Sequence, residues 1–368
     1  MIEMNWFLPT GGDSRDVLPD ENSINRAPSH EYLAQVARAC EDLGFEALLT
    51  PCGTGCEDAW LATSSLIALT SRIKFLVAFR PALLTPTLAA QMASTMQRMS
   101  GGRCIVNIVT GAEQAELARF GITEDKETRY ERTGEFVQVM RGAWSGEPFS
   151  FKGKFFEVTD ATTREVPSPI PPIYFGGASD AAENVAAENV DLYLSWGETP
   201  AAITERHERV AAKAAAHGRS VRFGIRFHTI ARPTSEEAWA VADNILNSMS
   251  PDAIAVARED FLKTQSVGQR RQFDLHGGDL SKLEIHPNVW AGIGLVRGGV
   301  GTALVGSYEE VADRIVEYHK LGIDAFIMSG YPHLEEAYWF GEGVMPILRE
   351  RGYLPALEGG PTKVFSFR

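Results

Sequence analysis

Residues 74–109 read KFLVAFRPALLTPTLAAQMASTMQRMSGGRCIVNIV, and this stretch decides the fold. Two short apolar runs rich in β-favouring residues, Lys74–Phe79 and Cys104–Val109, enclose an amphipathic segment at Pro86–Met99. A strand, a helix and a second strand in this order are typical of a parallel βα unit.

The same alternation runs along the chain and predicts a strand followed by a helix in each unit. The other expected strands are Met4–Leu8, Glu46–Thr50, Pro172–Phe175, Leu192–Ser195, Arg222–Ile230 and Ala325–Met328. The other expected helices are His30–Leu43, Asp58–Leu69, Tyr130–Trp144, Ala181–Glu188, Ala201–Ala216, Ser235–Ser248 and Leu334–Arg349.

Eight such units favour an α/β protein with one domain, residues 1–368, folded as a (β/α)8 TIM barrel with insertions. The active site of such a barrel lies where the carboxyl ends of the strands meet their loops. The alternative is an open doubly wound sheet, which would place a GxGxxG phosphate loop soon after an early strand. No such motif follows the first two expected strands.

Two segments interrupt the alternation. Residues 146–172 contain FSFKGKFFEV and then PSPIPPI, which predicts a short hairpin and a proline-rich return outside the barrel. Residues 251–306 are long for a connection in a compact domain, which favours a lid, an oligomer contact or a disordered loop. Their GLVRGGVG core has glycines on both sides of Arg297, the pattern of a mobile lid that delivers a charge.

Charge and composition restrict the classes of partner. The chain carries 35 basic and 48 acidic residues for a formal charge of -13, which argues against binding nucleic acid or an anionic membrane over a wide surface. An anion would have to be bound by local arginines. The N-terminus lacks a basic segment followed by an apolar run, and no apolar stretch approaches the ~20 residues that span a bilayer, so we expect a cytoplasmic protein.

Four cysteines are too few for a disulfide framework and fit a reducing compartment. Cys52 and Cys56 form a CxxxC pair without further cysteine or histidine ligands, so no metal site is predicted.

The segment RFGIRFH, residues 222–228, places Arg226 and His228 two residues apart, which puts both side chains on one face of a strand. An arginine that is always charged and an imidazole that titrates near neutral pH can together hold an anion and handle a proton. Arg297 follows in the glycine-rich loop, and Tyr331 and His333 stand where the last strand gives way to a helix. The alternative is structural: an ion pair for Arg226, a hydrogen-bonded core imidazole for His228, a solvated charge for Arg297 and simple packing for Tyr331.

Several longer motifs are similar to one family. They are WFLPTGGD (6–13), CEDAWL (56–61), FLVAFRP (75–81), VNIVTG (106–111), RYE (129–131), YFGGASD (174–180), DLYLSWGE (191–198), FGIRFH (223–228), NVWAGIGLVRGGVGTALVG (288–306) and SGYPHLEEAY (329–338). Together they resemble the flavin-dependent alkanesulfonate monooxygenases, which belong to the bacterial-luciferase-like group of two-component flavoenzymes. The resemblance runs from about Trp6 to Leu348.

The resemblance implies a reaction and its partners. A separate NAD(P)H-dependent flavin reductase would supply reduced FMN, with which dioxygen reacts in this protein. Cleavage of the carbon–sulfur bond of an organosulfonate would then release sulfite and an aldehyde. The chain would act as a homo-oligomer, a dimer or a tetramer.

The resemblance also implies site residues. The substrate set is Trp196, Arg226, His228, Arg297, Tyr331 and His333, among which Arg226, His228, Arg297 and Tyr331 would be catalytic. The flavin set is Cys56, Asn107, Thr110, Tyr130, Gly176, Gly177 and Ser179. Backbone N–H groups of the two glycines and the hydroxyl of Ser179 could cradle the FMN phosphate, whereas the structural alternative is an ordinary glycine turn and helix N-cap.

The sequence departs from the family at two positions. Gly11 stands where the family has a histidine in WFLPTHGD, and Gly55 stands where it has an arginine in IPTGRS. Two missing polar side chains at one rim favour a bulkier polar sulfonate such as the sulfosugar sulfoquinovose. A rearranged loop is the alternative, which leaves a short- or medium-chain alkanesulfonate or methanesulfonate as substrate.

Two other functions stay open on the sequence. A deazaflavin-dependent reductase of the same superfamily would not need the two arginines. A non-catalytic flavin-binding paralogue would not need the set Arg226, His228, Arg297, Tyr331 and His333.

Overall fold

The computed structural model describes residues 1–19, 23–111 and 113–357. In this part of the chain, eight parallel strands close into a barrel, because β10 and β11, at the two ends of the eight-strand run, also pair with each other. The strands, in their order around the barrel, are β10 (Leu192–Trp196), β9 (Ile173–Gly176), β6 (Cys104–Ile108), β5 (Lys74–Phe79), β4 (Ala47–Thr50), β1 (Glu3–Phe7), β15 (Ile323–Ser329) and β11 (Arg222–Arg232). The predicted TIM barrel and its strands are confirmed.

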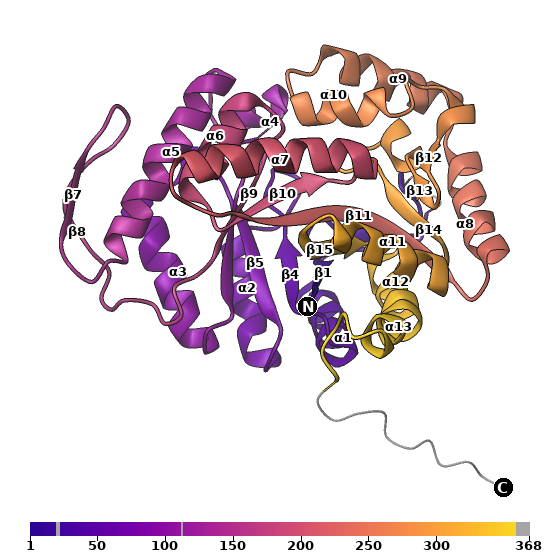
Figure 1. Cartoon of the computed structure of the whole chain (residues 1–368), viewed down its shortest axis with the longest axis horizontal. Helices are drawn as coiled ribbons and strands as arrows, with labels where there is room; N and C mark the ends of the chain where they lie inside the picture. The colour runs from indigo at the N-terminus through magenta and orange to yellow at the C-terminus, as the bar shows by residue number, and fades with distance from the viewer. Residues whose placement is uncertain (20–22, 112, 358–368) are drawn as a thin grey trace, which may run out of the picture.

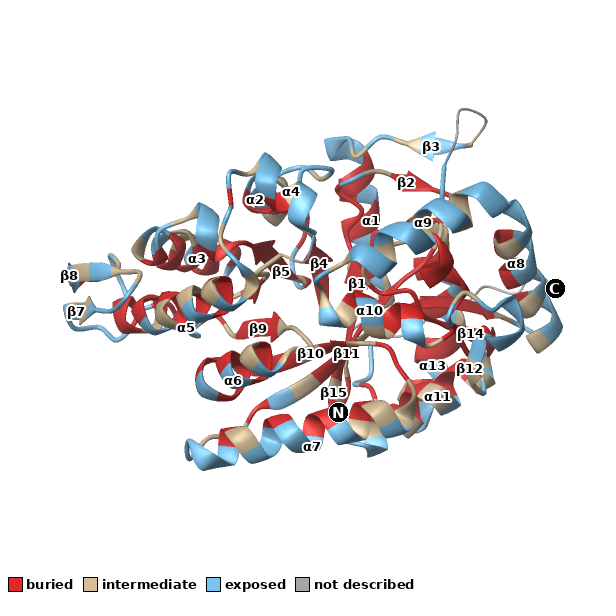
Figure 2. Ribbon diagram, turned by 90° about the horizontal axis from the view of Figure 1, so that it is seen from above, coloured by how far each residue is buried: buried red, intermediate tan, exposed pale blue. Residues whose placement is uncertain are grey.

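Helices surround the barrel, and their outer faces are exposed while the strands are buried (Figures 1 and 2). They are α1 (His30–Leu43), α2 (Ala59–Leu66), α3 (Pro86–Ser100), α5 (Lys126–Ala143), α6 (Asp180–Asn189), α7 (Pro200–Ala216), α8 (Ser235–Ser248), α11 (Tyr308–Lys320) and α12 (His333–Trp339), which continues through a π-helical turn (Phe340–Val344) into α13 (Met345–Glu350). Helix α1 shows why such segments fold. Its apolar residues face the core, Ser29 caps its first turn by accepting from the Tyr32 N–H at 3.2 Å, and Gly44 ends it at a φ of 86°.

Three helix boundaries differ from the predicted ones. Helix α2 ends at Leu66 and a 3-10 turn covers Ile67–Leu69. Helix α5 begins at Lys126 rather than Tyr130, because Asp125 caps it by accepting from the Thr128 N–H. The predicted helix Leu334–Arg349 is interrupted by the π-helical turn.

Residues 146–172 contain an antiparallel pair, β7 (Phe149–Lys152) and β8 (Glu157–Ala161). The pair extends away from the barrel beside α5 (Figure 1). A second small antiparallel pair, β2 (Asp13–Ser14) and β3 (Asn25–Arg26), follows β1, and the short helix α4 (Gln114–Arg119) follows β6.

Residues 251–306 are largely ordered into elements that a long loop would lack. They form α9 (Pro251–Lys263), α10 (Val267–Asp274), a 3-10 turn (Leu280–Lys282), β12 (Glu284–His286), β13 (Val289–Trp290), a 3-10 turn (Gly292–Leu295) and β14, which runs to Ser307 (Ala303–Ser307). Strand β14 pairs in parallel with the far end of β11, so it extends the barrel sheet. A disordered loop is therefore wrong for most of this segment, whereas a lid or an oligomer contact stays a prediction, and helix α11, which follows β14, lies outside the predicted helices.

The four cysteines are free thiols, of which Cys40 and Cys104 are buried. No helix in the described ranges is long and apolar enough to span a bilayer.

Candidate active site

A chamber opens at the carboxyl ends of the barrel strands, the end at which this fold carries its active sites. It encloses about 1340 Å³ of atom-free space, including its open mouth. Six of the residues predicted to contact the flavin line it: Asn107, Thr110, Tyr130, Gly176, Gly177 and Ser179. Trp196 and Arg226 line it from β10 and β11.

Arg226 is a half-buried cation of the chamber. Its Nε and Nη2 atoms are buried and have no hydrogen-bond partner among the described residues. Its guanidinium carbon lies 4.5 Å from the centre of the Phe7 ring. Burial, and secondarily the charge of Arg297, lowers the pKa of Arg226 to about 9. A buried guanidinium with free donors is an anion-binding group, because an anion would both satisfy the donors and compensate the charge.

A cluster of rings adjoins Arg226. The ring centres of His228 and Tyr331 are 5.3 Å apart, and those of Tyr331 and His333 are 5.4 Å apart. Burial and then the charges of Arg297 and Arg226 hold the pKa of His228 well below its usual range, so this imidazole is neutral. These three residues lie behind the chamber wall rather than in its lining.

Asp13 closes the cluster from β2, and the sequence analysis assigned it no role. Its buried carboxylate accepts from the His333 backbone N–H at 2.8 Å and is 2.8 Å from His333 Nδ1. Tyr32 donates its phenol to the same carboxylate. Asp13 and His333 are 320 residues apart in sequence, so only the barrel closure between β1 and β15 brings them together.

Arg297 and Cys56 border this region. Arg297 is partly buried, and its Nη1 makes only long contacts with the carbonyls of Gly298 (3.3 Å) and Val300 (3.4 Å). Burial raises the pKa of the Cys56 thiol, whose hydrogen bond with Thr10 acts in the opposite direction. Neither residue lines the chamber, whereas Cys52 does.

The opposite end of the chamber is built for a second anion. Ser179 caps α6 by accepting from the Ala182 N–H at 3.3 Å, and the preceding backbone is tight: a Cβ on Gly177 would lie 2.6 Å from the Ala182 Cβ and 3.0 Å from the Tyr130 hydroxyl. Lys126 and Arg129, from the first turns of α5, line the same region. Burial lowers the pKa of both cations, and the buried Arg129 Nε has no partner.

This end fits the phosphate of a flavin mononucleotide. A phosphate monoester is bound by N–H groups at a helix N-terminus, by hydroxyl groups and by cations. This end of the chamber offers all three, and the two glycines leave the backbone open to the ligand. The sequence analysis predicts flavin contacts for the two glycines, Tyr130 and Ser179; they line the chamber, and their role stays a prediction. Sequence reasoning had missed Lys126 and Arg129, whose only signal was a charged first turn after Asp125.

Comparison with known proteins adds the family. The sequence profile of the luciferase-like monooxygenases matches residues 2–325. This chain belongs to that family. Among solved structures, riboflavin lyase RcaE, determined with modified FMN and riboflavin, has a TM-score of 0.77 at 19% identity and covers 96% of this chain and 93% of its own.

Two further structures are similar to this luciferase-like monooxygenase. The long-chain alkane monooxygenase LadA has a TM-score of 0.76 at 21% identity, with 98% of this chain and 94% of that chain covered. The EDTA monooxygenase EmoA from Chelativorans sp. BNC1 has a TM-score of 0.73 at 18% identity, with 96% and 95% covered. At these identities the likeness shows the fold.

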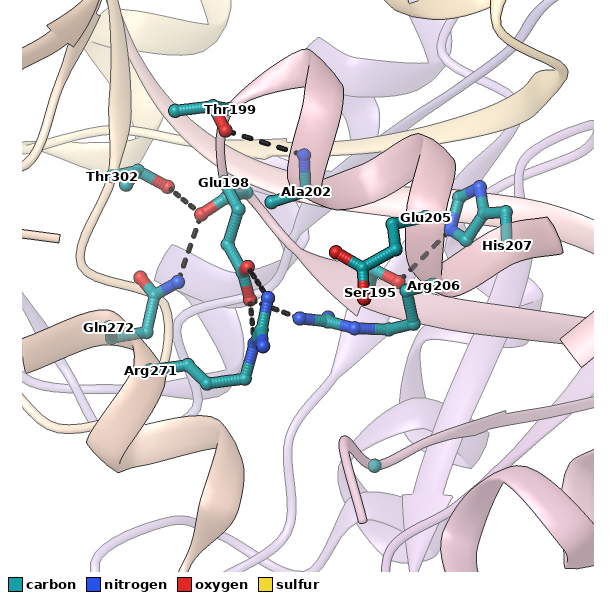
Figure 3. Close-up of polar contacts among 12 residues, drawn as sticks. Ser195, Glu198, Thr199, Ala202, Glu205, Arg206, His207, Arg271, Gln272 and Thr302 are labelled. Carbon is teal, nitrogen blue, oxygen red and sulfur yellow. Dashed lines mark hydrogen bonds and ion pairs between the residues drawn. The ribbon is translucent and has the colours of Figure 1, made fainter. Parts of the chain in front are cut away.

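In this monooxygenase an ion-pair network joins the chamber to α10 (Figure 3). Glu198, which is 3% exposed, pairs with Arg206 of α7 and through both carboxylate oxygens with Arg271 of α10. Beside it, Gln272 and Thr302 both donate to the Gly197 carbonyl, at 2.9 and 3.0 Å.

Two glutamines of α10 also hold the loop that carries Arg297. The side-chain oxygens of Gln269 and Gln272 accept from the N–H groups of Gly299 at 2.7 Å and Gly301 at 2.8 Å. Helix α10 therefore connects the chamber wall to the glycine-rich loop. Sequence reasoning missed this connection because it expected a loop at α10.

Proposed function

We propose that this luciferase-like monooxygenase uses reduced FMN and dioxygen to cleave the carbon–sulfur bond of an organosulfonate, giving sulfite and an aldehyde. The observation that carries the proposal is Arg226, whose guanidinium lines the chamber from β11 with two buried nitrogens that have no partner among the described residues. A sulfonate spreads one negative charge over three oxygens, and such an anion matches the fork of a guanidinium.

The charge of the chamber supports an anionic substrate. Its lining has four cations, Lys126, Arg129, Arg206 and Arg226, and a single carboxylate, Glu198. This excess of three positive charges lies within a chain whose formal charge is -13. Two anionic groups, a flavin phosphate at the α6 end and a sulfonate at Arg226, would compensate it.

The protein would supply position and protection to the reaction. Lys126, Arg129, Tyr130 and Ser179 would hold the phosphate, while Trp196 would form an aromatic wall. When bound, the reduced flavin supplies the electrons that activate dioxygen. Arg226 and Arg297 would hold the sulfonate through charge-assisted hydrogen bonds, and the loop that carries Arg297 would exclude water.

A separate NAD(P)H-dependent flavin reductase is the partner we propose, because the chain lacks a nicotinamide-binding fingerprint. We also propose a homo-oligomer. Within the sulfonates, a bulky polar substrate such as sulfoquinovose is the first to test, since the sequence lacks the family's histidine at Gly11 and its arginine at Gly55.

The test is sulfite release by the purified protein with a flavin reductase, NADPH and FMN, on sulfoquinovose, 1-octanesulfonate and methanesulfonate. We expect sulfite from at least one of them and none without FMN or oxygen. Arg297→Ala should lower the rate by at least about a hundredfold and change flavin affinity less than about threefold, since its charge acts on the bound sulfonate.

Absence of sulfite from all three substrates, with tight binding of reduced FMN preserved, would refute the sulfonate assignment. Reduction of a deazaflavin-linked substrate would instead support the reductase alternative.

A further inference from the structure

Asp13 makes hydrogen bonds only as an acceptor in the described structure. The Ser14 N–H donates to it at 3.0 Å, the His333 N–H donates to both oxygens, and the phenol of Tyr32 donates to Oδ2. Although burial acts to raise it, the pKa of Asp13 lies below its usual range, because His333 and Tyr32 stabilise the ionised form. The carboxylate is therefore ionised at neutral pH.

An ionised carboxylate cannot donate, so the 2.8 Å contact between Asp13 and His333 Nδ1 requires the proton on Nδ1. In the neutral imidazole the other nitrogen, Nε2, then carries a free lone pair. Nε2 points away from Asp13 because the two ring nitrogens lie on opposite sides of the ring. It is buried and has no partner in the described part of the chain.

His333 lies in the ring cluster that adjoins Arg226, directly behind the chamber lining. The His333 ring lies 5.2 Å from the Phe7 ring and 5.4 Å from the Tyr331 ring. Phe7 carries the guanidinium of Arg226 on its face, and Tyr331 stacks with His228. His333 thus shares both aromatic neighbours with the residues that would hold the sulfonate.

His228 is the other imidazole near the sulfonate, but its surroundings are unfavourable to a base. Its Nδ1 lies 3.0 Å from the Ser329 hydroxyl, and its described contacts include no carboxylate. Arg226 and Arg297 both oppose a positive charge on His228. A proton on His333 would instead be compensated by Asp13 at 2.8 Å.

Resting on the proposed function, we propose that His333 is the general base of the reaction and that Asp13 is the residue that positions it. The overall change is RCH₂SO₃⁻ + O₂ + FMNH₂ → RCHO + SO₃²⁻ + FMN + H₂O + H⁺. Dioxygen gives one oxygen atom to the carbon next to sulfur, which forms the C=O bond, and the two electrons of FMNH₂ reduce the other oxygen atom to water. The same carbon loses one hydrogen as a proton, and its bond to sulfur breaks with the electron pair leaving on sulfite. Nε2 of His333 accepts this proton, and Asp13 stabilises the imidazolium that results.

The sequence analysis counts His228, and not His333, among the catalytic residues, whereas the surroundings of the two imidazoles favour His333 as the base. Around the pair, the titratable or charged side chains include Tyr32 on α1, Arg26 on β3, Tyr331 and Glu335 beside His333, Arg226 and His228 on β11, and Arg297 on the glycine-rich loop. Only Asp13 accepts from the imidazole N–H.

The first test reads the tautomer without any reaction. Nitrogen-15 chemical shifts of the histidine rings, assigned to His333 by comparison with His333→Asn, should show a protonated Nδ1 and an unprotonated Nε2 at pH 7.5. In Asp13→Asn the side-chain amide can donate to Nδ1, and the Nε2–H tautomer should appear. A wild-type ring protonated on Nε2 would overturn the proposal.

The second test is kinetic and uses 1-octanesulfonate and its 1,1-dideuterated form as probes. His333→Asn retains an N–H donor toward Asp13 but has no base, and we expect kcat to fall by about 10²–10⁴. The kcat of Asp13→Asn should fall by about 10² or more. Its deuterium isotope effect should be larger than that of the wild type, because proton removal becomes slower. Its pH profile should shift, while the Kd of reduced FMN stays within about threefold.

A matched control is Asp191→Asn, at the amino end of β10 on the opposite end of the barrel. That carboxylate also accepts from a backbone N–H, Ile173 at 2.8 Å, and from a cation, Arg141 at 2.9 Å. Its loss should affect stability and leave the isotope effect and pH profile of sulfite release unchanged.

The outcomes separate the two proposals. Suppose that the wild type releases sulfite and that Asp13→Asn and His333→Asn keep its kcat, isotope effect and pH profile. This result would overturn the assignment of the base but not the proposed function. If Asp13→Asn does not fold, His333→Asn decides. No sulfite from the wild type would overturn the proposed function.

Discussion

Gly11 shows how a single missing side chain acts in this site. A Cβ built on Gly11 would lie 2.9 Å from the backbone oxygen of Gly55 and 3.7 Å from the sulfur of Cys56. Neither Gly11 nor Gly55 lines the chamber, and the backbone of the Gly55 turn occupies the space beside Gly11. The sequence interpretation that Gly11 opens volume for a bulkier substrate therefore gains no support at this position.

We predict that Gly11→Ala lowers the free energy of unfolding by about 1–3 kcal/mol, because backbone rather than a flexible side chain must move. Activity on every sulfonate should fall alike, since the displaced turn carries Cys56. Urea unfolding and sulfite release measure the two effects.

Gly55→Ala is the matched control, because a Cβ there meets nothing within 4 Å. Its stability should stay within about 0.5 kcal/mol of the wild type. A Gly11→Ala protein as stable as Gly55→Ala would contradict the close approach of the two loops.

At the scale of residues, the sequence predicts some partners of the site and cannot predict others. Arg226 is identifiable because a permanent charge in an apolar strand needs a partner, and a barrel strand offers few. The pairing of Asp13 with His333 is not identifiable, since both are common residue types in loops and meet only when β1 and β15 become neighbours.

Among the elements, α10 contacts both the chamber wall and the loop that carries Arg297. Arg271 pairs with the buried Glu198 of the chamber wall, and Gln269 and Gln272 hold the backbone of the Arg297 loop. We predict that Arg271→Gln loosens α10, because Glu198 then keeps Arg206 alone as a charged partner. A lost charge-assisted hydrogen bond of about 1.5–3 kcal/mol corresponds to roughly ten- to a hundredfold faster exchange of the α10 amide hydrogens.

Hydrogen exchange followed by mass spectrometry measures this effect. Arg209→Gln on α7 is the control, since Arg209 pairs with Glu183 and Glu205 and not with α10. If α10 exchanges at the same rate in Arg271→Gln as in the control, the ion pair does not hold the helix.

The elements also show which sequence signals are informative. Barrel strands such as β5 and β6 are almost entirely buried and appear as continuous apolar runs, so all eight were predictable. Helix α9 has no fully buried residue, and its partly buried apolar residues, which include Ile254, Ala257 and Phe261, form only a narrow stripe. Helix α11 does have a stripe and a capping box at Ser307 and Glu310, but it followed a segment interpreted as a lid.

For the whole molecule, the sign of the charge differs between the chain as a whole and the chamber. The chain is acidic overall, whereas the chamber lining has an excess of positive charge. Such a focused potential attracts small anions to the barrel mouth and keeps extended polyanions away from the rest of the surface. It also means that protonation of further buried groups near these arginines is unfavourable.

The stability of the whole molecule should consequently depend on pH through its buried neutral imidazoles. Burial, and then Arg206, lowers the pKa of His207 to about 3, and His207 is 4% exposed, stacked 4.2 Å from the Phe223 ring and 3.1 Å from the Ser195 hydroxyl. Burial also lowers the pKa of His228 well below its usual range. Between the folded and unfolded pKa values the unfolded chain binds more protons, so acid favours unfolding.

We predict that the free energy of unfolding is highest above pH ~6.5 and declines as pH falls below it, by about 1.4 kcal/mol per pH unit for each such imidazole. For His207 alone this amounts to about 2 kcal/mol between pH 7.5 and pH 5. In His207→Phe, which keeps the stacked ring, the decline should be smaller by that amount, whereas His217→Gln, at a largely exposed position, should retain the full wild-type decline. Urea unfolding of the three proteins at pH 7.5, 6 and 5 measures the slopes, and parallel slopes for wild type and His207→Phe would show that His207 is protonated in the folded barrel.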